Sequence, residues 1–224
     1  MRIQKYLSEQ GVMSRRAAEA AMRAGKVAVN GEIVRDLGRQ IEPLRDKVEV
    51  KGVATGETVL INKPRGIVSS RVLREGRTIY QEFPHYAHLH VAGRLDKESE
   101  GLLVLTDDGV IAKQLTGAAH PVEKEYHVTV RENLRGSELA AMARGVRLKD
   151  GMTLPATVTK LDAHSFSIVL REGKNHQIRR MADKARLTVT RLVRARIGPL
   201  TLQGLKPGAA RTLSKEETMA LRQL

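Results

Sequence analysis

Residues 91–109, VAGRLDKESEGLLVLTDDG, decide the fold, because a continuous apolar run follows a short charged loop. The run at 101–106, GLLVLT, has the length of a strand and no polar alternation, which is typical of a strand buried on both faces. Asp107 or Asp108 is placed to cap a helix that continues through residues 111–115. The stretch therefore predicts a central strand with a charged loop at its start and a helix at its end.

Several further strands are predicted around this central one. Runs with β-prone composition are found at residues 58–62, 125–130, 156–161, 165–170 and 187–193. The predicted strands outnumber the predicted helices and do not alternate regularly with them. We therefore predict an α+β fold with a mixed, mainly antiparallel sheet over residues 58–224, rather than a doubly wound sheet.

Residues 1–51 are predicted to form a separate, small helix–helix–hairpin module. Two helices are expected, the second of them capped by Ser14. Two β-prone runs follow and are joined by Asn30-Gly31, which is the strongest short-range signal for a hairpin. Residues 52–57 are small, polar and glycine-containing, so we expect them to link this module to the larger unit.

The charge of the chain favours a polyanionic partner. Lys and Arg number 39 against 25 acids, a formal net charge of +14, and nucleic acid is the commonest partner of such a surface. Aromatic residues make up only 3% of the chain and there is no Trp, which argues against a base-stacking platform. Phosphate contacts are therefore expected to supply most of the affinity for RNA.

Two groups of cations are predicted to contact RNA. Arg15, Arg16 and Arg23 gather on the second helix, and the first two lie at its N-terminal end, where free backbone N–H groups also favour phosphate. Residues 171–196 hold nine Lys or Arg against two acids, half of the formal net charge. In this segment Asn175 is expected to cap a helix whose polar face presents Arg179 and Arg180, so an RNA-facing groove is predicted.

The rest of the composition limits the classes of protein to which this chain can belong. Hydrophobic residues make up 41% of the chain, which supports a packed core. The absence of Cys excludes a disulfide framework and a thiolate zinc site. No apolar run reaches the roughly 20 residues of a membrane span, and no signal peptide is recognised, so we expect a soluble cytoplasmic protein that acts as a monomer.

Asp96 is the candidate for chemistry, because it lies between two cations, Arg94 and Lys97. Burial raises the pKa of a carboxyl group, whereas a nearby cation favours the ionised form. Arg94 shares a face with Asp96 in an extended segment, but it is equally placed to reach RNA. Lys174, distant in sequence, is the better partner if the two loops converge.

Four motifs in this order resemble the RsuA-type ribosomal RNA pseudouridine synthases: INKPRG, VAGRLDKESEGLLVLTDDG, EKEYHV and REGKNHQIRRM. The segment SRRAAEAAMRAGKVAVNGEIV also resembles the small RNA-binding module shared by a ribosomal small-subunit protein, tyrosyl-tRNA synthetases and several RNA-modifying enzymes. Together the two resemblances span nearly the whole chain. One departure is Ala209-Ala210-Arg211, where many relatives carry a bulky aromatic residue before the Arg, and this leaves the subgroup open.

The resemblance implies roles for specific residues. Asp96 would be the catalytic carboxylate, Tyr126 would stack on the target uracil, and Lys174 would be the basic partner of Asp96. Arg94 would help to hold the target nucleotide out of its helix. The family uses no metal and no organic cofactor. The expected substrate is a uridine in ribosomal RNA that is naked or in an assembling subunit, with a slight preference for the large subunit.

Three other interpretations were weighed against this one. A glycoside hydrolase would pair Asp96 with Glu98 or Glu100, but hydrolysis would discard the base. The histidines of HYAHLH, residues 85–90, lack the acid or Cys that would complete a metal site. A non-catalytic RNA-binding or ribosome-assembly protein would account for the charge and the N-terminal module, but it leaves Asp96, Tyr126 and Lys174 unexplained.

Overall fold

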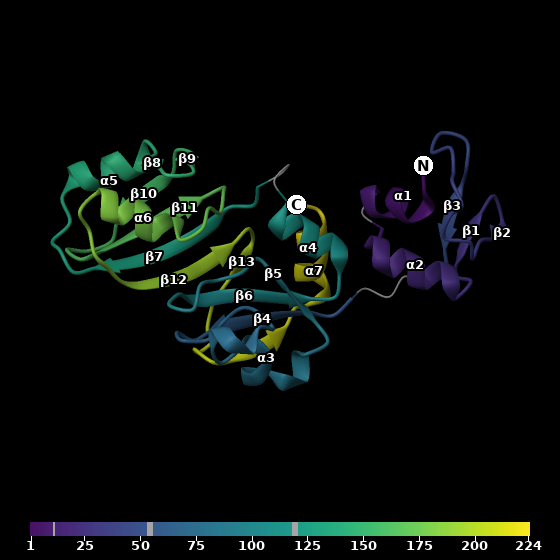
Figure 1. Cartoon of the computed structure of the whole chain (residues 1–224), viewed down its shortest axis with the longest axis horizontal. Helices are drawn as coiled ribbons and strands as arrows, with labels where there is room; N and C mark the ends of the chain where they lie inside the picture. The colour runs from purple at the N-terminus through teal and green to yellow at the C-terminus, as the bar shows by residue number, and fades with distance from the viewer. Residues whose placement is uncertain (11, 53–55, 118–120) are drawn as a thin grey trace.

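The computed structural model describes residues 1–10, 12–52, 56–117 and 121–224 and shows two units joined in sequence (Figure 1). The first unit contains helices α1 (Ile3–Glu9) and α2 (Arg15–Arg23) and a three-stranded antiparallel sheet in the order β2-β1-β3. Its strands are β1 (Val27–Val29), β2 (Glu32–Ile33) and β3 (Val48–Val50). Residues 53–55 of the predicted linker lie outside the described residues.

Local signals account for the shape of this first unit. The Ser14 hydroxyl accepts a hydrogen bond from the Ala17 amide and caps α2 as predicted. Asn30 and Gly31 have φ angles of 53° and 85°, which is the backbone of a primed two-residue hairpin turn between β1 and β2. The predicted helix–helix–hairpin pattern is confirmed, while the third strand, β3, was not foreseen.

The second unit is built on a mixed sheet in the order β10-β11-β7-β12-β6-β4-β14. The pairing of β12 with β6 is parallel and the other pairings are antiparallel, so the predicted fold class is confirmed. Two short strands, β5 (His90–Ala92) and β13 (Leu200–Thr201), pair with β6 and β12. The main strands are β4 (Thr58–Lys63), β6 (Glu100–Thr106), β7 (Lys124–Val130), β10 (Thr157–Lys160), β11 (Ser165–Leu170), β12 (Val189–Ile197) and β14 (Ala210–Thr212).

Strand β6 is buried on both faces, as its apolar run predicts. Leu102 and Val104 pack into one hydrophobic cluster, and Leu103 and Leu105 pack into another on the opposite face. The first cluster is covered by α4 (Gly109–Thr116) and α7 (Lys215–Arg222), which lie side by side in Figure 1. The second is covered by the segment between β4 and β5, which carries η1 (Leu73–Glu75), α3 (Ile79–Glu82) and η2 (Pro84–Tyr86).

The other half of the sheet has its own core. Helices α5 (Gly136–Ala143) and α6 (Gln177–Lys184) cover β10, β11 and β7 (Figure 1). Met142 of α5 and Met181 of α6 are fully buried there against Phe166. A short hairpin of β8 (Arg147–Leu148) and β9 (Gly151–Met152) follows α5.

Of the two helix caps predicted in this unit, that of α4 is confirmed and that of α6 is not. Asp108 caps α4 by accepting hydrogen bonds from the amides of Val110 and Ile111, and Ser214 begins α7 with a capping box. The prediction that Asn175 caps α6 was wrong. The chain takes a left-handed turn at His176, with φ of 48°, and the side chain of Gln177 reaches back to the Lys174 amide.

None of the helices in the described ranges has the length and the apolar character needed to cross a membrane.

Candidate active site

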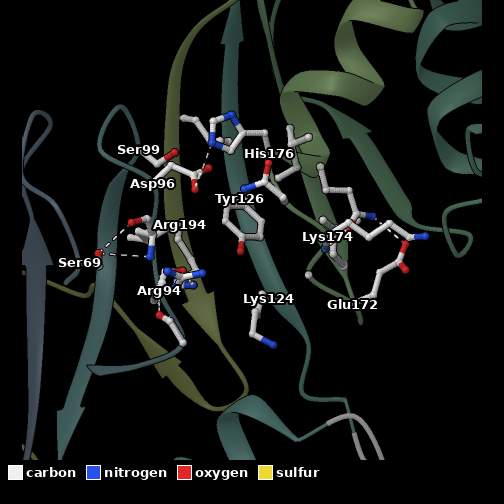
Figure 2. Close-up of a pocket in the computed structure, with 18 of the residues that line it drawn as sticks. Ser69, Arg94, Asp96, Ser99, Lys124, Tyr126, Glu172, Lys174, His176 and Arg194 are labelled. Atoms are coloured by element: carbon white, nitrogen blue, oxygen red, sulfur yellow. Dashed lines mark hydrogen bonds and ion pairs between the residues drawn. The ribbon is translucent and has the colours of Figure 1, made fainter. Parts of the chain in front are cut away.

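A cavity of about 1080 Å³ lies where the loop between β5 and β6 meets strand β7 and the segment that precedes α6 (Figure 2). The loop that carries Asp96 and the segment that carries Lys174 both line this cavity. The predicted residues that line the cavity are Arg94, Asp96, Tyr126, Lys174 and Arg179.

The loop that carries Asp96 is fixed by hydrogen bonds to its backbone. Each of the six consecutive carbonyl groups from Gly93 to Glu98 accepts a hydrogen bond. Arg194 holds the first two, the Ser69 hydroxyl holds the carbonyl of Leu95, and the amide of Ser99 holds that of Asp96 itself. A loop with no free carbonyl over this length holds its carboxylate in one place, which is what a catalytic acid or base requires.

Arg194 is the central support of this loop. It lies on β12 and is only 2% exposed. Its Nη2 donates to the Gly93 carbonyl at 2.9 Å, its Nη1 to the Arg94 carbonyl at 3.3 Å, and its Nε to the Leu102 carbonyl at 2.7 Å. One buried guanidinium thereby ties the start of the Asp96 loop to strand β6.

Lys63 supports the same loop from the end of β4. Its side chain is fully buried, and its Nζ donates to the Ile67 carbonyl at 2.7 Å and to the Lys97 carbonyl at 3.5 Å. Burial lowers the pKa of Lys63 to about 8, although the carboxylates of Glu100 and Asp96 act in the opposite direction. A second positive charge is therefore held behind the loop of Asp96.

The side chain of Asp96 is 39% exposed and faces the cavity, and the basic residue beside it is not the predicted Lys174. His176 lies with its Nε2 3.6 Å from Asp96 Oδ1 (Figure 2). Lys174 points away from Asp96, because its Nζ donates to the carbonyl of Asp150 at 2.9 Å. The structure thus brings Lys174 into the cavity wall but does not pair it with Asp96.

Tyr126 is placed by the alternation of side chains along β7. Residues 124 and 126 face the cavity, whereas Glu123 and Glu125 face away and pair with Arg171 and Arg196. Tyr126 is half-buried and packs against the hydrophobic clusters of both halves of the sheet, which leaves its ring at the cavity between Asp96 and Lys174 (Figure 2).

The predicted RNA-binding residues fall into two groups. Arg15, Arg16 and Arg23 are exposed on α2, and Arg94 is exposed beside Asp96. Arg179 and Arg180 instead have protein partners. Arg179 donates to the Glu98 carbonyl at 2.9 Å, and Arg180 forms a two-bond ion pair with Asp150.

The charge concentrated in residues 171–196 also serves the fold more than the sequence indicates. Arg171, Arg191 and Arg196 form ion pairs with glutamates outside the segment, and Arg194 is buried. Much of this charge therefore neutralises glutamates that lie outside the segment, and the RNA-facing groove stays a prediction.

Sequence reasoning missed several residues that build the site. Lys63, Lys124 and His176 stand inside the motifs INKPRG, EKEYHV and REGKNHQIRRM, so the motifs held a signal that was not used. Ser69 and Arg194 stand outside all four motifs, and nothing local marks them.

Two family models and a solved structure match the chain. A family model described as RNA pseudouridylate synthase matches residues 57–184, and a model of the S4 domain matches residues 1–43. A crystal structure of a pseudouridylate synthase is 33% identical, with a TM-score of 0.72 and coverage of 99% of both chains.

Curated relatives match over nearly the full length of the chain. A ribosomal large subunit pseudouridine synthase B of Bacillus subtilis is 35% identical over 100% of this chain and 96% of its own. A ribosomal small subunit pseudouridine synthase A of Haemophilus influenzae is 34% identical over 97% of each chain. A dual-specificity RNA pseudouridine synthase of Salmonella typhi is 34% identical over 98% of this chain and 78% of its own. With both domain matches in the predicted order, the chain belongs to the RsuA-type family of RNA pseudouridine synthases and carries an S4 domain before its synthase domain.

Proposed function

We propose that this protein isomerises one or a few uridines of ribosomal RNA to pseudouridine, with Asp96 as the catalytic carboxylate. The observation that carries the proposal is the loop of residues 93–98, whose carbonyls are all hydrogen-bonded and which presents Asp96 to a cavity that also holds Tyr126. A carboxylate held this firmly beside an aromatic ring suits a reaction at a single nucleotide.

The chemistry requires few groups. The bond from uracil N1 to the anomeric carbon breaks, the base turns, and C5 forms the new bond to the same carbon, so no redox agent or activated donor is needed. Asp96 acts either as a nucleophile on the sugar or as a base that removes a sugar proton, and both routes need the ionised carboxylate. His176 lies beside this carboxylate, with its Nε2 3.6 Å from Asp96 Oδ1.

The other cavity residues take roles around the flipped nucleotide. Tyr126 stacks on the detached uracil and retains it while it turns. Arg94, exposed beside Asp96, holds the nucleotide out of the RNA helix, which offsets an unstacking cost of a few kcal/mol. Lys174 contacts the RNA from the cavity wall. Its hydrogen bond to the backbone carbonyl of Asp150 supports this role, because it holds the ammonium group away from Asp96.

The proposed substrate is naked or partly assembled ribosomal RNA. The names of the relatives include both a large-subunit and a small-subunit synthase, and we put the large-subunit RNA first. Arg15, Arg16 and Arg23 bind phosphates, so the S4 domain contributes affinity, while the RNA fold selects the uridine. Mature ribosomes should be poor substrates, because ribosomal proteins would bury the site.

Replacement of Asp96 by Asn tests the catalytic assignment. We expect tritium release from RNA labelled at uridine C5 to fall by at least about a thousandfold, while RNA affinity stays within about threefold, because the amide keeps the shape but lacks the charge. Glu98→Gln is the matched control, an exposed carboxylate in the same loop, and it should keep nearly full turnover. A parallel loss of binding and turnover in Asp96→Asn would make Asp96 a structural residue.

The substrate is tested by chemical mapping of pseudouridine in a deletion strain. We expect one or a few pseudouridines to disappear from large-subunit RNA and to return with the wild-type gene but not with Asp96→Asn. If the lost pseudouridine is in small-subunit RNA, the proposed subunit is wrong, but the proposed reaction on ribosomal RNA stands. Unchanged ribosomal RNA with a modification missing from transfer RNA would refute the proposed substrate.

A further inference from the structure

Lys124 lines the same cavity as Tyr126 and lies two positions before it on β7. Alternate residues of a strand share one face, so both side chains project toward the place where the uracil would stack. Figure 2 shows Lys124 beside Tyr126 on the cavity side of the strand. The Lys124 side chain and the Tyr126 ring therefore line the same wall of the cavity, and the ammonium group is within the reach of a flexible side chain from a base on that ring.

The Lys124 ammonium group has N–H groups that donate no hydrogen bond in the described part of the chain. Its Nζ donates to the Val122 carbonyl at 3.2 Å, which uses one of its three N–H bonds. Within the described residues Lys124 belongs to no ion pair, although Glu123 and Glu125 flank it in sequence. Those two carboxylates point to the other face of the strand and are taken by Arg171 and Arg196.

Positive charge accumulates on this side of the cavity. Burial lowers the pKa of Lys124, and the neighbouring charge of Arg194 lowers it further. A partly buried cation without an acidic partner favours a ligand that carries or develops negative charge, because a preorganised donor stabilises charge without reorganisation.

The reaction supplies such a charge. Whether Asp96 attacks the sugar or removes a proton from it, the electron pair of the broken N1–C1′ bond stays on the uracil, where it spreads over N1 and the two carbonyl oxygens. C5 then bonds to C1′ while the ester bond from Asp96 to C1′ breaks or, in the other route, while Asp96 returns the abstracted proton to the sugar. The C5 proton passes to solvent, and N1 takes up a proton. The departing base is thus anionic for as long as it is detached.

We infer that Lys124 donates a hydrogen bond to a carbonyl oxygen of the target uracil and stabilises the negative charge that the base acquires when its glycosidic bond breaks. The inference rests on the proposed function and adds a catalytic residue to it. The ammonium keeps its proton throughout and acts as a fixed donor. Tyr126 holds the ring by its face, and Lys124 holds it by its edge.

The first test compares Lys124→Met and Lys124→Arg with the wild type under single-turnover conditions at saturating enzyme. We expect Lys124→Met to slow tritium release by about a hundredfold, the usual effect of removing one donor to a developing anion, with RNA affinity within about threefold. Lys124→Arg should recover most of the rate, because it keeps a charged donor.

Lys160→Met is the matched control. Lys160 also donates its Nζ to a backbone carbonyl, that of Leu134 at 2.8 Å, but it lies on β10 and is not among the residues that line the cavity. Its replacement should leave the rate unchanged. Thermal melts of all variants show whether each is folded, and rates are compared per folded molecule.

The second test uses RNA with 5-fluorouridine at the target position. The rate at which 5-fluorouridine is converted is measured by chromatography of the digested nucleosides. Fluorine makes the base more acidic, so its anion needs less stabilisation, and the penalty of Lys124→Met should shrink at least about fivefold. A purely structural role would give the same penalty on both substrates.

Two results would overturn the inference: a wild-type rate in folded Lys124→Met, or equal penalties on uridine and 5-fluorouridine. An inactive wild-type protein would instead remove the proposed function, and the inference with it.

Discussion

Arg194 is the largest fully buried side chain in the described part of the chain, and it is a cation. Its guanidinium group donates hydrogen bonds to three backbone carbonyls, those of Gly93, Arg94 and Leu102, instead of to water. Within the described residues it forms no ion pair, so these carbonyls and the neighbouring acids must compensate the cost of burying its charge. The same hydrogen bonds fix the start of the loop that carries Asp96.

Arg194→Met should therefore impair turnover more than binding. Three carbonyls would lose their donors, and we expect about 3 kcal/mol less free energy of unfolding, together with a tenfold or greater fall in kcat and little change in KM. Arg194→Lys should restore part of kcat, because its ammonium reaches some of the same carbonyls. Chemical denaturation and the tritium assay measure the two effects.

Arg191→Met is the control for that experiment. Arg191 lies on the same strand, but its side chain is 57% exposed and pairs with Glu100 at the surface. Its loss should change the free energy of unfolding by less than about 1 kcal/mol. If folded Arg194→Met turned over as fast as Arg191→Met, the loop would not depend on the buried guanidinium.

At the scale of elements, the site depends on the close parallel contact between β6 and β12. These strands pair over only two positions, Glu100 with Val193 and Gly101 with Arg194. Gly101 has a φ of 104°, and a Cβ there would lie 2.7 Å from the backbone nitrogen of Arg194. Only glycine allows this backbone conformation and this close approach of the two strands. The contact joins β6, which follows the Asp96 loop, to the half of the sheet that carries Tyr126.

Gly101→Ala should consequently destabilise the synthase domain strongly. We expect a loss of about 3 kcal/mol or more in the free energy of unfolding, because the new methyl group meets backbone atoms that cannot move without separating the strands. Thermal denaturation measures the loss. Gly136→Ala is the control: Gly136 begins α5, and a Cβ there has nothing within 4 Å, so its melting temperature should stay the same or rise slightly.

At the scale of the whole molecule, the two units have separate cores. The buried cluster of the S4 domain is drawn from residues 3–50 alone. Contact with the synthase domain includes Arg222 of α7, which donates to the Val12 carbonyl at 3.2 Å and to Asp108 Oδ2 at 2.8 Å. Contacts of this kind orient one unit against the other without merging their interiors.

Removal of residues 1–51 should leave a folded synthase domain. We expect a cooperative melt and slow turnover on short RNA, with weaker affinity and a shallower salt dependence, because Arg15, Arg16 and Arg23 no longer release counterions from phosphates. Full-length protein with these three arginines changed to Ala separates lost RNA contacts from lost structure, and should show a similar fall in affinity. An insoluble or molten remainder would show that the two units share a core.

The sequence alone determined the features that depend on residues a few positions apart. The Asn30-Gly31 turn, the caps at Ser14 and Asp108, and the buried run at 101–106 each follow from local backbone preference or side-chain periodicity. The family motifs singled out Asp96 and Tyr126, and both residues line one cavity. The cap predicted at Asn175 failed, because His176 takes a left-handed conformation and the helix begins only at Gln177.

Only the tertiary structure decided which charges meet. His176 rather than Lys174 lies beside Asp96, Arg194 and Lys63 support its loop, and much of the basic segment 171–196 pairs with acids of other strands. Long side chains choose their partners among groups brought together by strand register and packing, often across a hundred residues of sequence. A local pattern shows that a cation is present, but only the packed sheet fixes where its charge is satisfied.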